Sequence, residues 1–123
     1  MIVRKVFSCA AVCICALLLL SCKQDGHADA TQPLQQSFQT AGPAVTQAIA
    51  SVTTSLKSGN YTEAGRALEP VLAGRKLTAE QQKAIGVLFN QISQAVSANP
   101  ALDSKELYEL RVRLAKAARG DRF

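Results

Sequence analysis

Residues 78–99, TAEQQKAIGVLFNQISQAVSAN, decide the fold class. Thr78 is a preferred residue type just before a helix, and Gln81 lies three positions further on, where its side chain can complete a capping box. The large apolar residues that follow recur at intervals of three and four, which places them along one face of a helix. They are Ile85, Leu88, Phe89, Ile92 and Val96. Because Asn99 and Pro100 end the pattern, the sequence predicts a helix over 78–98.

An earlier stretch, 33–58, carries a single apolar stripe that Gly42 and Pro43 interrupt. A proline inside a helix removes one backbone hydrogen bond and crowds the preceding turn. We therefore expect either a kinked helix or two helices, over about 33–41 and 43–58. The stripe keeps its phase across the break, which slightly favours the kink. Its members are Leu34, Phe38, Ala41, Val45, Ala48, Val52 and Leu56.

Two more helices are predicted from their caps. Asn60 begins a helix over 60–72, which is expected to bury Tyr61, Ala64, Leu68, Val71 and Leu72 and to end near Pro70 and Gly74. Asp103, with Glu106 three residues later, begins a helix over 103–119 that Gly120 stops. Leu102 is placed to pack onto Leu107, and Glu109 is spaced to pair with Arg113. The core line of this helix is Leu107, Leu110, Leu114 and Ala117 or Ala118.

The connections between these helices are short, so neighbouring helices should be antiparallel. No segment alternates apolar and polar residues with the period of a strand. The predicted fold is all-α: a small antiparallel helical-hairpin domain over 33–120, either tetratricopeptide-like or a four-helix bundle.

One hairpin carries a motif of its own. Residues 57–72, KSGNYTEAGRALEPVL, resemble the junction of a tetratricopeptide repeat through Gly59, Asn60, Tyr61, Glu63 and Ala64. The resemblance covers residues 45–72 and departs at Pro70. The second hairpin does not repeat the motif, so the resemblance concerns the geometry of one hairpin. It implies a protein-binding scaffold.

The N-terminus has the parts of an export signal: basic Arg4 and Lys5, and then an apolar run over 6–20. The run is shorter than the roughly 20 residues of a membrane-spanning helix. It ends in Leu19, Leu20, Ser21 and Cys22, which resemble the lipobox of bacterial lipoproteins. The resemblance implies a signal peptide over 1–21, cleavage between Ser21 and Cys22, and a lipid anchor on the Cys22 sulfur.

In enterobacterial lipoproteins an Asp directly after the lipid-bearing Cys retains the protein in the inner membrane, and here that residue is Lys23. The resemblance therefore implies a cell-envelope location at the outer membrane, facing the periplasm. Residues 22–32 are polar apart from small residues and are predicted to form the lipidated Cys22 and a flexible tether. His27 is the single histidine of the chain, and we expect it to bind no metal.

The composition argues against most catalytic chemistry. All four cysteines lie at or before Cys22, which leaves no thiol nucleophile, metal site or disulfide after the lipidated position. The part after the cut has 12 basic against nine acidic residues, a surplus too small to indicate nucleic acid. We expect no cofactor beyond the covalent lipid, and no small-molecule substrate. Carboxylate pairs, Glu63 with Glu69 and Glu106 with Glu109, are the remaining basis for an enzyme.

Five cations gather near the C-terminus: Arg111, Arg113, Lys116, Arg119 and Arg122. Cations at the end of a helix complement its dipole, which accounts for them structurally, and contact with an anionic partner is the alternative. The function that the sequence favours is a non-catalytic, membrane-anchored module that binds an unidentified protein. A structural or polyanion-binding lipoprotein is the alternative, and Val45 and Ile49 are then candidates for self-association.

Overall fold

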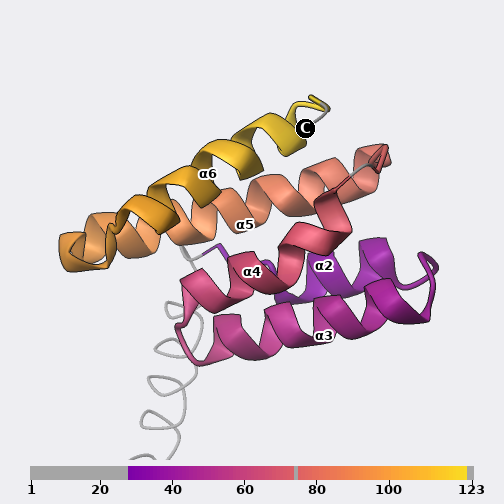
Figure 1. The fold of residues 1–123 in the computed structure, drawn as a ribbon, viewed down its shortest axis with the longest axis horizontal. Coiled ribbons are helices and arrows are strands. Elements are labelled where there is room, and N and C mark those ends of the chain that lie inside the picture. Colours follow the sequence, from indigo (N-terminus) through magenta and orange to yellow (C-terminus); the bar gives the residue numbers. More distant parts are fainter. Residues whose placement is uncertain (1–27, 74, 122–123) are drawn as a thin grey trace, which may run out of the picture.

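A computed structural model describes residues 28–73 and 75–121. This part of the chain forms five α-helices and one short 3-10 helix, and it contains no strand (Figure 1). The elements are α2 (Thr31–Phe38), α3 (Pro43–Lys57), α4 (Tyr61–Leu72), α5 (Ala79–Ala98), η2 (Pro100–Leu102) and α6 (Lys105–Ala118). The predicted all-α class is confirmed. The predicted signal peptide, the cleavage site at Ser21 and Cys22, and His27 lie outside the described residues.

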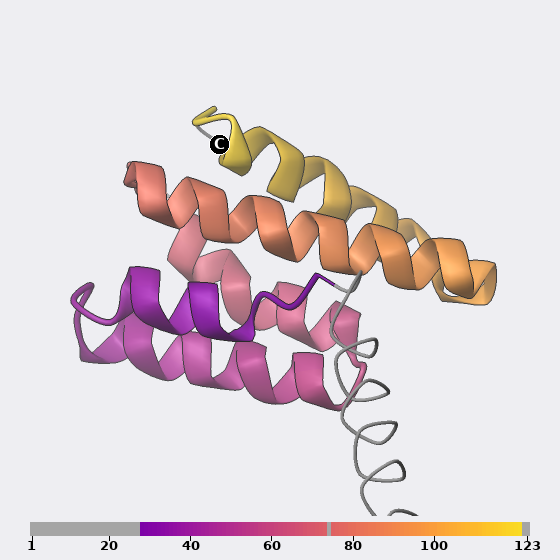
Figure 2. The ribbon, with the colours of Figure 1, turned by 180° about the vertical axis from the view of Figure 1, so that it is seen from behind.

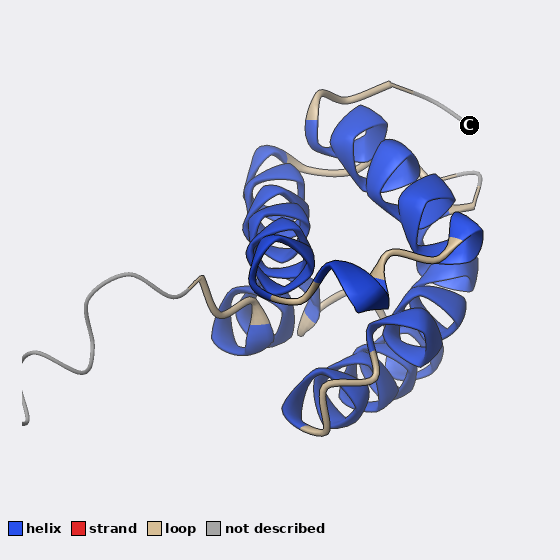
Figure 3. Cartoon of the chain, turned by 90° about the vertical axis from the view of Figure 1, so that its left-hand side faces the viewer, coloured by secondary structure: helices blue, strands red, loops and turns tan. Residues whose placement is uncertain are grey.

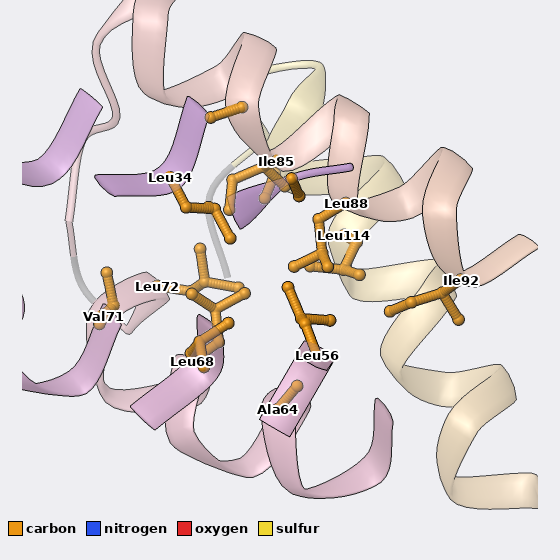
Figure 4. Packing of buried hydrophobic residues seen from close by; sticks show 14 of the residues in the cluster. Leu34, Leu56, Ala64, Leu68, Val71, Leu72, Ile85, Leu88, Ile92 and Leu114 are labelled. Carbon is orange, nitrogen blue, oxygen red and sulfur yellow. The ribbon is translucent and has the colours of Figure 1, made fainter. Parts of the chain in front are cut away.

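Consecutive helices run in alternating directions (Figures 1 and 2). The longest helix, α5, lies between α2 and α6 and packs on both. Below this layer α3 packs on α2 and α4, while α4 also reaches α6 (Figure 3). The arrangement encloses one core to which all five α-helices contribute. Its fully buried side chains include Leu34, Val52, Leu68, Ile85, Leu88 and Leu114, several of which converge in Figure 4.

The break at Gly42 and Pro43 separates two helices, so the slightly favoured kink is wrong. The chain turns back after Phe38, and Gly42 adopts a φ of +108°, a conformation that favours glycine. Pro43 is then the first residue of α3, where its missing N–H costs no helical hydrogen bond. The apolar stripe continues through the turn because both helices bury one face in the same core.

The α3–α4 hairpin follows the prediction closely. Gly59 turns the chain with a φ of +75°, and the Asn60 side chain accepts a hydrogen bond from the Glu63 N–H at 3.4 Å. Ala64 is fully buried, as expected where two helices approach closely, whereas Tyr61 is only partly buried. Pro70 lies inside α4, and the helix continues to Leu72. Phe89 of α5, expected in the core, is also only partly buried.

The caps of the last two helices differ in outcome. The capping box of α5 is confirmed: the Thr78 N–H donates to Gln81 Oε1 at 3.0 Å, and the Gln81 N–H donates to Thr78 Oγ1 at 3.2 Å. The cap of α6 is Ser104, not Asp103, since the Leu107 N–H donates to Ser104 Oγ at 3.1 Å. Asp103 follows η2, and its carboxylate pairs with an arginine instead.

The predicted tether over 22–32 is wrong for its last five residues. Ala30 is fully buried, and α2 begins directly after it. The N–H groups of Ala28 and Ala30 donate to the side-chain oxygens of Gln94 and Gln91 on α5, at 3.1 and 2.9 Å. These long-range contacts fix the segment although it has no apolar periodicity. The rest of the predicted tether, 22–27, lies outside the described residues.

Candidate partner-binding face of the last helix

The five predicted cations do not form one continuous patch. Arg111 and Arg113 are two residues apart on α6, so they project on opposite flanks of the helix. Arg113 pairs with Glu69 of α4, where Glu109 was expected as its partner. Arg119 pairs with Asp121 at 3.6 Å. Lys116 is exposed, and Arg122 lies outside the described residues.

Arg111 is held more firmly than its neighbours. Its Nη2 donates to Asp103 Oδ1 at 2.7 Å, and its side chain is only 20% exposed. The guanidinium carbon lies 5.8 Å from the centre of the Tyr108 ring, within the range of a cation–π contact. Asp103 therefore fixes Arg111, and Arg111 in turn restrains the ring of Tyr108.

Three of the four carboxylates that were candidates for catalysis, Glu63, Glu69 and Glu106, pair with arginines. Glu63 and Glu106 both contact Arg66, with 2.9 Å between Arg66 Nε and Glu106 Oε1. The hydrogen bonds that Arg66 donates to Glu106, and then the charges of Glu106 and Glu63, raise the pKa of Arg66 above its ordinary value. These side chains are about half exposed, so water screens the pairs.

The side of α6 that faces away from the core carries an apolar ridge. In the described part of the chain the large hydrophobic side chains that remain exposed are Leu102, Tyr108 and Val112, at 36%, 58% and 38%. Tyr108 and Val112 are four residues apart and lie one above the other on the helix. We call this surface the outer face of α6. It consists of Lys105, Tyr108, Glu109, Val112 and Lys116, whereas Leu102 lies in η2, which packs on α5.

The sequence prediction did not include the outer face, because it used only the apolar residues of the core line. Leu107, Leu110, Leu114 and Ala117 are all buried, as predicted. On a helical wheel Val112 falls nearly opposite Leu107 and Leu114, and Tyr108 falls on the flank next to Val112. A second apolar line on a helix that already has a core line was the signal that could have found this surface.

A shallow basic region adjoins the other flank of α6. Arg75 and Lys76, which the sequence analysis did not single out, line a pocket of about 220 Å³ together with Leu72 and Ala117. Asp121 also lines the pocket and offsets part of its positive charge. Leu72 separates it from a second pocket of about 360 Å³ beside Glu69 and Arg113.

Residues 28–73 and 75–121 contain no group of three or more His, Cys, Asp or Glu side chains placed to hold a metal ion. None of the helices described is both long and apolar enough to cross a membrane. Comparison of the chain with known protein families, curated proteins and solved structures finds no match to any of them.

Proposed function

We propose that this chain is a lipid-anchored protein of the cell envelope that binds a protein partner, without catalysis, through the outer face of α6. The observation that carries the proposal is the ridge formed by Tyr108 and Val112 on the outer face of α6. Apart from Leu102 in η2, every other large apolar side chain in the described residues is buried or partly buried. Apolar surface that a small domain keeps in water, gathered on one face and bordered by charges, is typical of an interaction site.

The composition of the ridge supports a protein as the ligand. Tyrosine is among the residue types that contribute most to protein interfaces, and Tyr108 is the most exposed large apolar side chain of this face. Because Asp103 and Arg111 already restrain Tyr108, its ring loses less conformational entropy when a partner covers it. The resemblance of the α3–α4 hairpin to a tetratricopeptide repeat favours the same kind of function.

The anchor in this proposal rests on Leu19, Leu20, Ser21 and Cys22. Each acyl methylene buried in a bilayer contributes about 0.8 kcal/mol, so two or three chains on one cysteine hold a domain of this size stably. Lys23 after the cysteine supports a location at the outer membrane, on the side that faces the periplasm.

Two other functions have less support. Acid–base catalysis by a carboxyl group needs a pKa raised toward the working pH, and Glu63, Glu69 and Glu106 are instead half-exposed partners of arginines. A self-associating structural lipoprotein was expected to use Val45 and Ile49. That assignment is wrong, because both side chains are buried in the core.

The test is chemical crosslinking of the tagged full-length protein in its native envelope, followed by mass identification of the captured proteins. Tyr108→Ser should reduce capture of a discrete partner about tenfold or more, as loss of an interface aromatic commonly does. Gln47→Ser changes an exposed residue on α3 and should leave capture unchanged.

A Cys22→Ser variant tests the anchor separately. It should remove the protein from the membrane fraction and lower capture of any partner that is itself held in the envelope. Equal capture by the Tyr108→Ser and Gln47→Ser variants would contradict the proposed binding face, and membrane retention of Cys22→Ser would contradict the anchor.

A further inference from the structure

We infer that the outer face of α6 docks an acidic amphipathic helix of another protein. This inference rests on the proposed function and specifies the chemistry of the partner. It is carried by two features: the exposed apolar side chains of this face and the charges that flank them.

The ridge has the form that a helical partner recognises. Tyr108 and Val112 stand one turn apart on α6, and both side chains are exposed. An amphipathic helix binds such a surface through apolar residues spaced at three and four along its own face. The apolar part is small, so the contact is of the transient kind and needs charge pairs to give it specificity.

The charges on this face are mainly positive. Lys105 and Lys116 are exposed at the two ends of the ridge, and neither forms an ion pair within the described residues. Glu109 is the single carboxylate among the residues of the outer face. Lys105 and Lys116 are 11 residues apart, which at 1.5 Å per residue separates them by ~16 Å along the helix. The complementary partner is therefore a helix with acidic residues about 11 positions apart and apolar residues between them.

A second copy of this chain fits the face poorly. If two copies of α6 packed antiparallel about the ridge, Lys105 of each copy would lie near Lys116 of the other. A parallel pair would place each lysine beside its own counterpart. Both arrangements bring like charges together, and two apolar side chains provide far less area than the ~1,200–2,000 Å² of a stable interface.

The experiment replaces Tyr108 in the full-length protein with the photoreactive residue benzoylphenylalanine and irradiates cells of the native host. The crosslinked peptide is then sequenced by mass spectrometry. We expect an acidic segment with carboxylates about 11 residues apart. The double variant Lys105→Glu and Lys116→Glu should lower its yield about fivefold, because rim charges govern encounter with a charged partner.

The matched control is Lys83→Glu with Arg75→Glu, which makes the same change in net charge at exposed positions outside the outer face and should leave the yield unchanged. Melting curves of both double variants establish that they fold. A crosslinked protein segment without acidic residues, or a yield that both double variants lower equally, would overturn the inference while leaving the proposed function intact. A crosslink to a second copy of the chain would also overturn the inference. No crosslinked protein at all would count against the proposed function itself.

Discussion

The α3–α4 hairpin and the α5–α6 hairpin are both antiparallel helix pairs, but they expose different surfaces. In the first, a tight turn at Gly59 joins the helices, and no large apolar side chain remains exposed. In the second, residues 99–104 form a longer connection that contains η2, and the exposed Leu102, Tyr108 and Val112 all lie on it or on α6.

The difference separates two tasks within one small domain. Helix α4 buries a single apolar face and uses its polar face for caps and ion pairs. Helix α6 has apolar residues on two faces: Leu110 and Leu114 in the core, and Tyr108 and Val112 in water. The first hairpin is explained by stability alone, whereas the second carries apolar surface that does not stabilise the fold.

The largest effect on stability should come from removing matched core leucines, one from each hairpin. Leu68→Ala in α4 and Leu114→Ala in α6 should each lower the free energy of unfolding by about 2–5 kcal/mol, because both side chains are fully buried. Tyr108→Ala should change it by less than about 0.5 kcal/mol. Urea denaturation followed by circular dichroism measures all three. If Tyr108→Ala lowered the free energy of unfolding as much as Leu114→Ala, Tyr108 would be part of the core. The difference between the two faces of α6 would then not hold.

The seam between the hairpins should be sensitive to a single methyl group. A Cβ at Gly65 of α4 would lie 2.9 Å from Leu110 Cδ1 and 3.1 Å from Leu110 Cγ on α6. Gly65→Ala should therefore destabilise the domain by about 1–3 kcal/mol through overpacking, reduced by the better helix propensity of alanine. Gly86→Ala on α5 is the control, since its nearest contact is an ordinary 3.8 Å. A stabilised Gly65→Ala protein would mean that Leu110 repacks freely.

The smallest effect concerns α2, which links the first hairpin to α5. The Thr31 backbone N–H donates to Asp29 Oδ1 at 2.9 Å, and this bond lowers the pKa of Asp29 below its ordinary value of 3.8. Because the pKa of Asp29 is lower in the folded state, the ionised carboxylate stabilises the folded state fully above pH 3.8. This stabilisation is lost as the pH falls through the lowered pKa. The difference in melting temperature between the wild type and Asp29→Asn should shrink accordingly between pH 6 and pH 2. A constant difference over this range would contradict the assignment.

Local patterns were enough to predict most of the helices. The helices predicted over 60–72 and 78–98 agree with α4 and α5, because capping residues and apolar spacing act within a few residues of each other. The spacing of Asp103 to Glu106 predicted the wrong cap for α6. Asp103 pairs instead with Arg111, eight residues further on, and Ser104 caps the helix.

The remaining differences depend on contacts between distant residues. The apolar stripe through Phe38 and Val45 is equally compatible with a kink and with a reversal, and only packing against the rest of the core decides between them. The sequence predicts Ala30 in a tether because the group that holds it in place is distant: its N–H donates to the side chain of Gln91, 61 residues away. The apolar ridge on α6 was overlooked for a related reason, because exposure becomes known only when the core line of every helix is placed.

The attachment of the N-terminal segment to α5 also has a mechanical consequence. A force that pulls on the chain ahead of Ala28 meets the hydrogen bonds to Gln94 and Gln91 before it reaches the backbone of α2. Ala30, fully buried directly behind these bonds, must leave the core before the first turn of α2 can unwind. The load is thus transferred to α5, the longest helix, so tension on the N-terminal segment is resisted by the packing of the core.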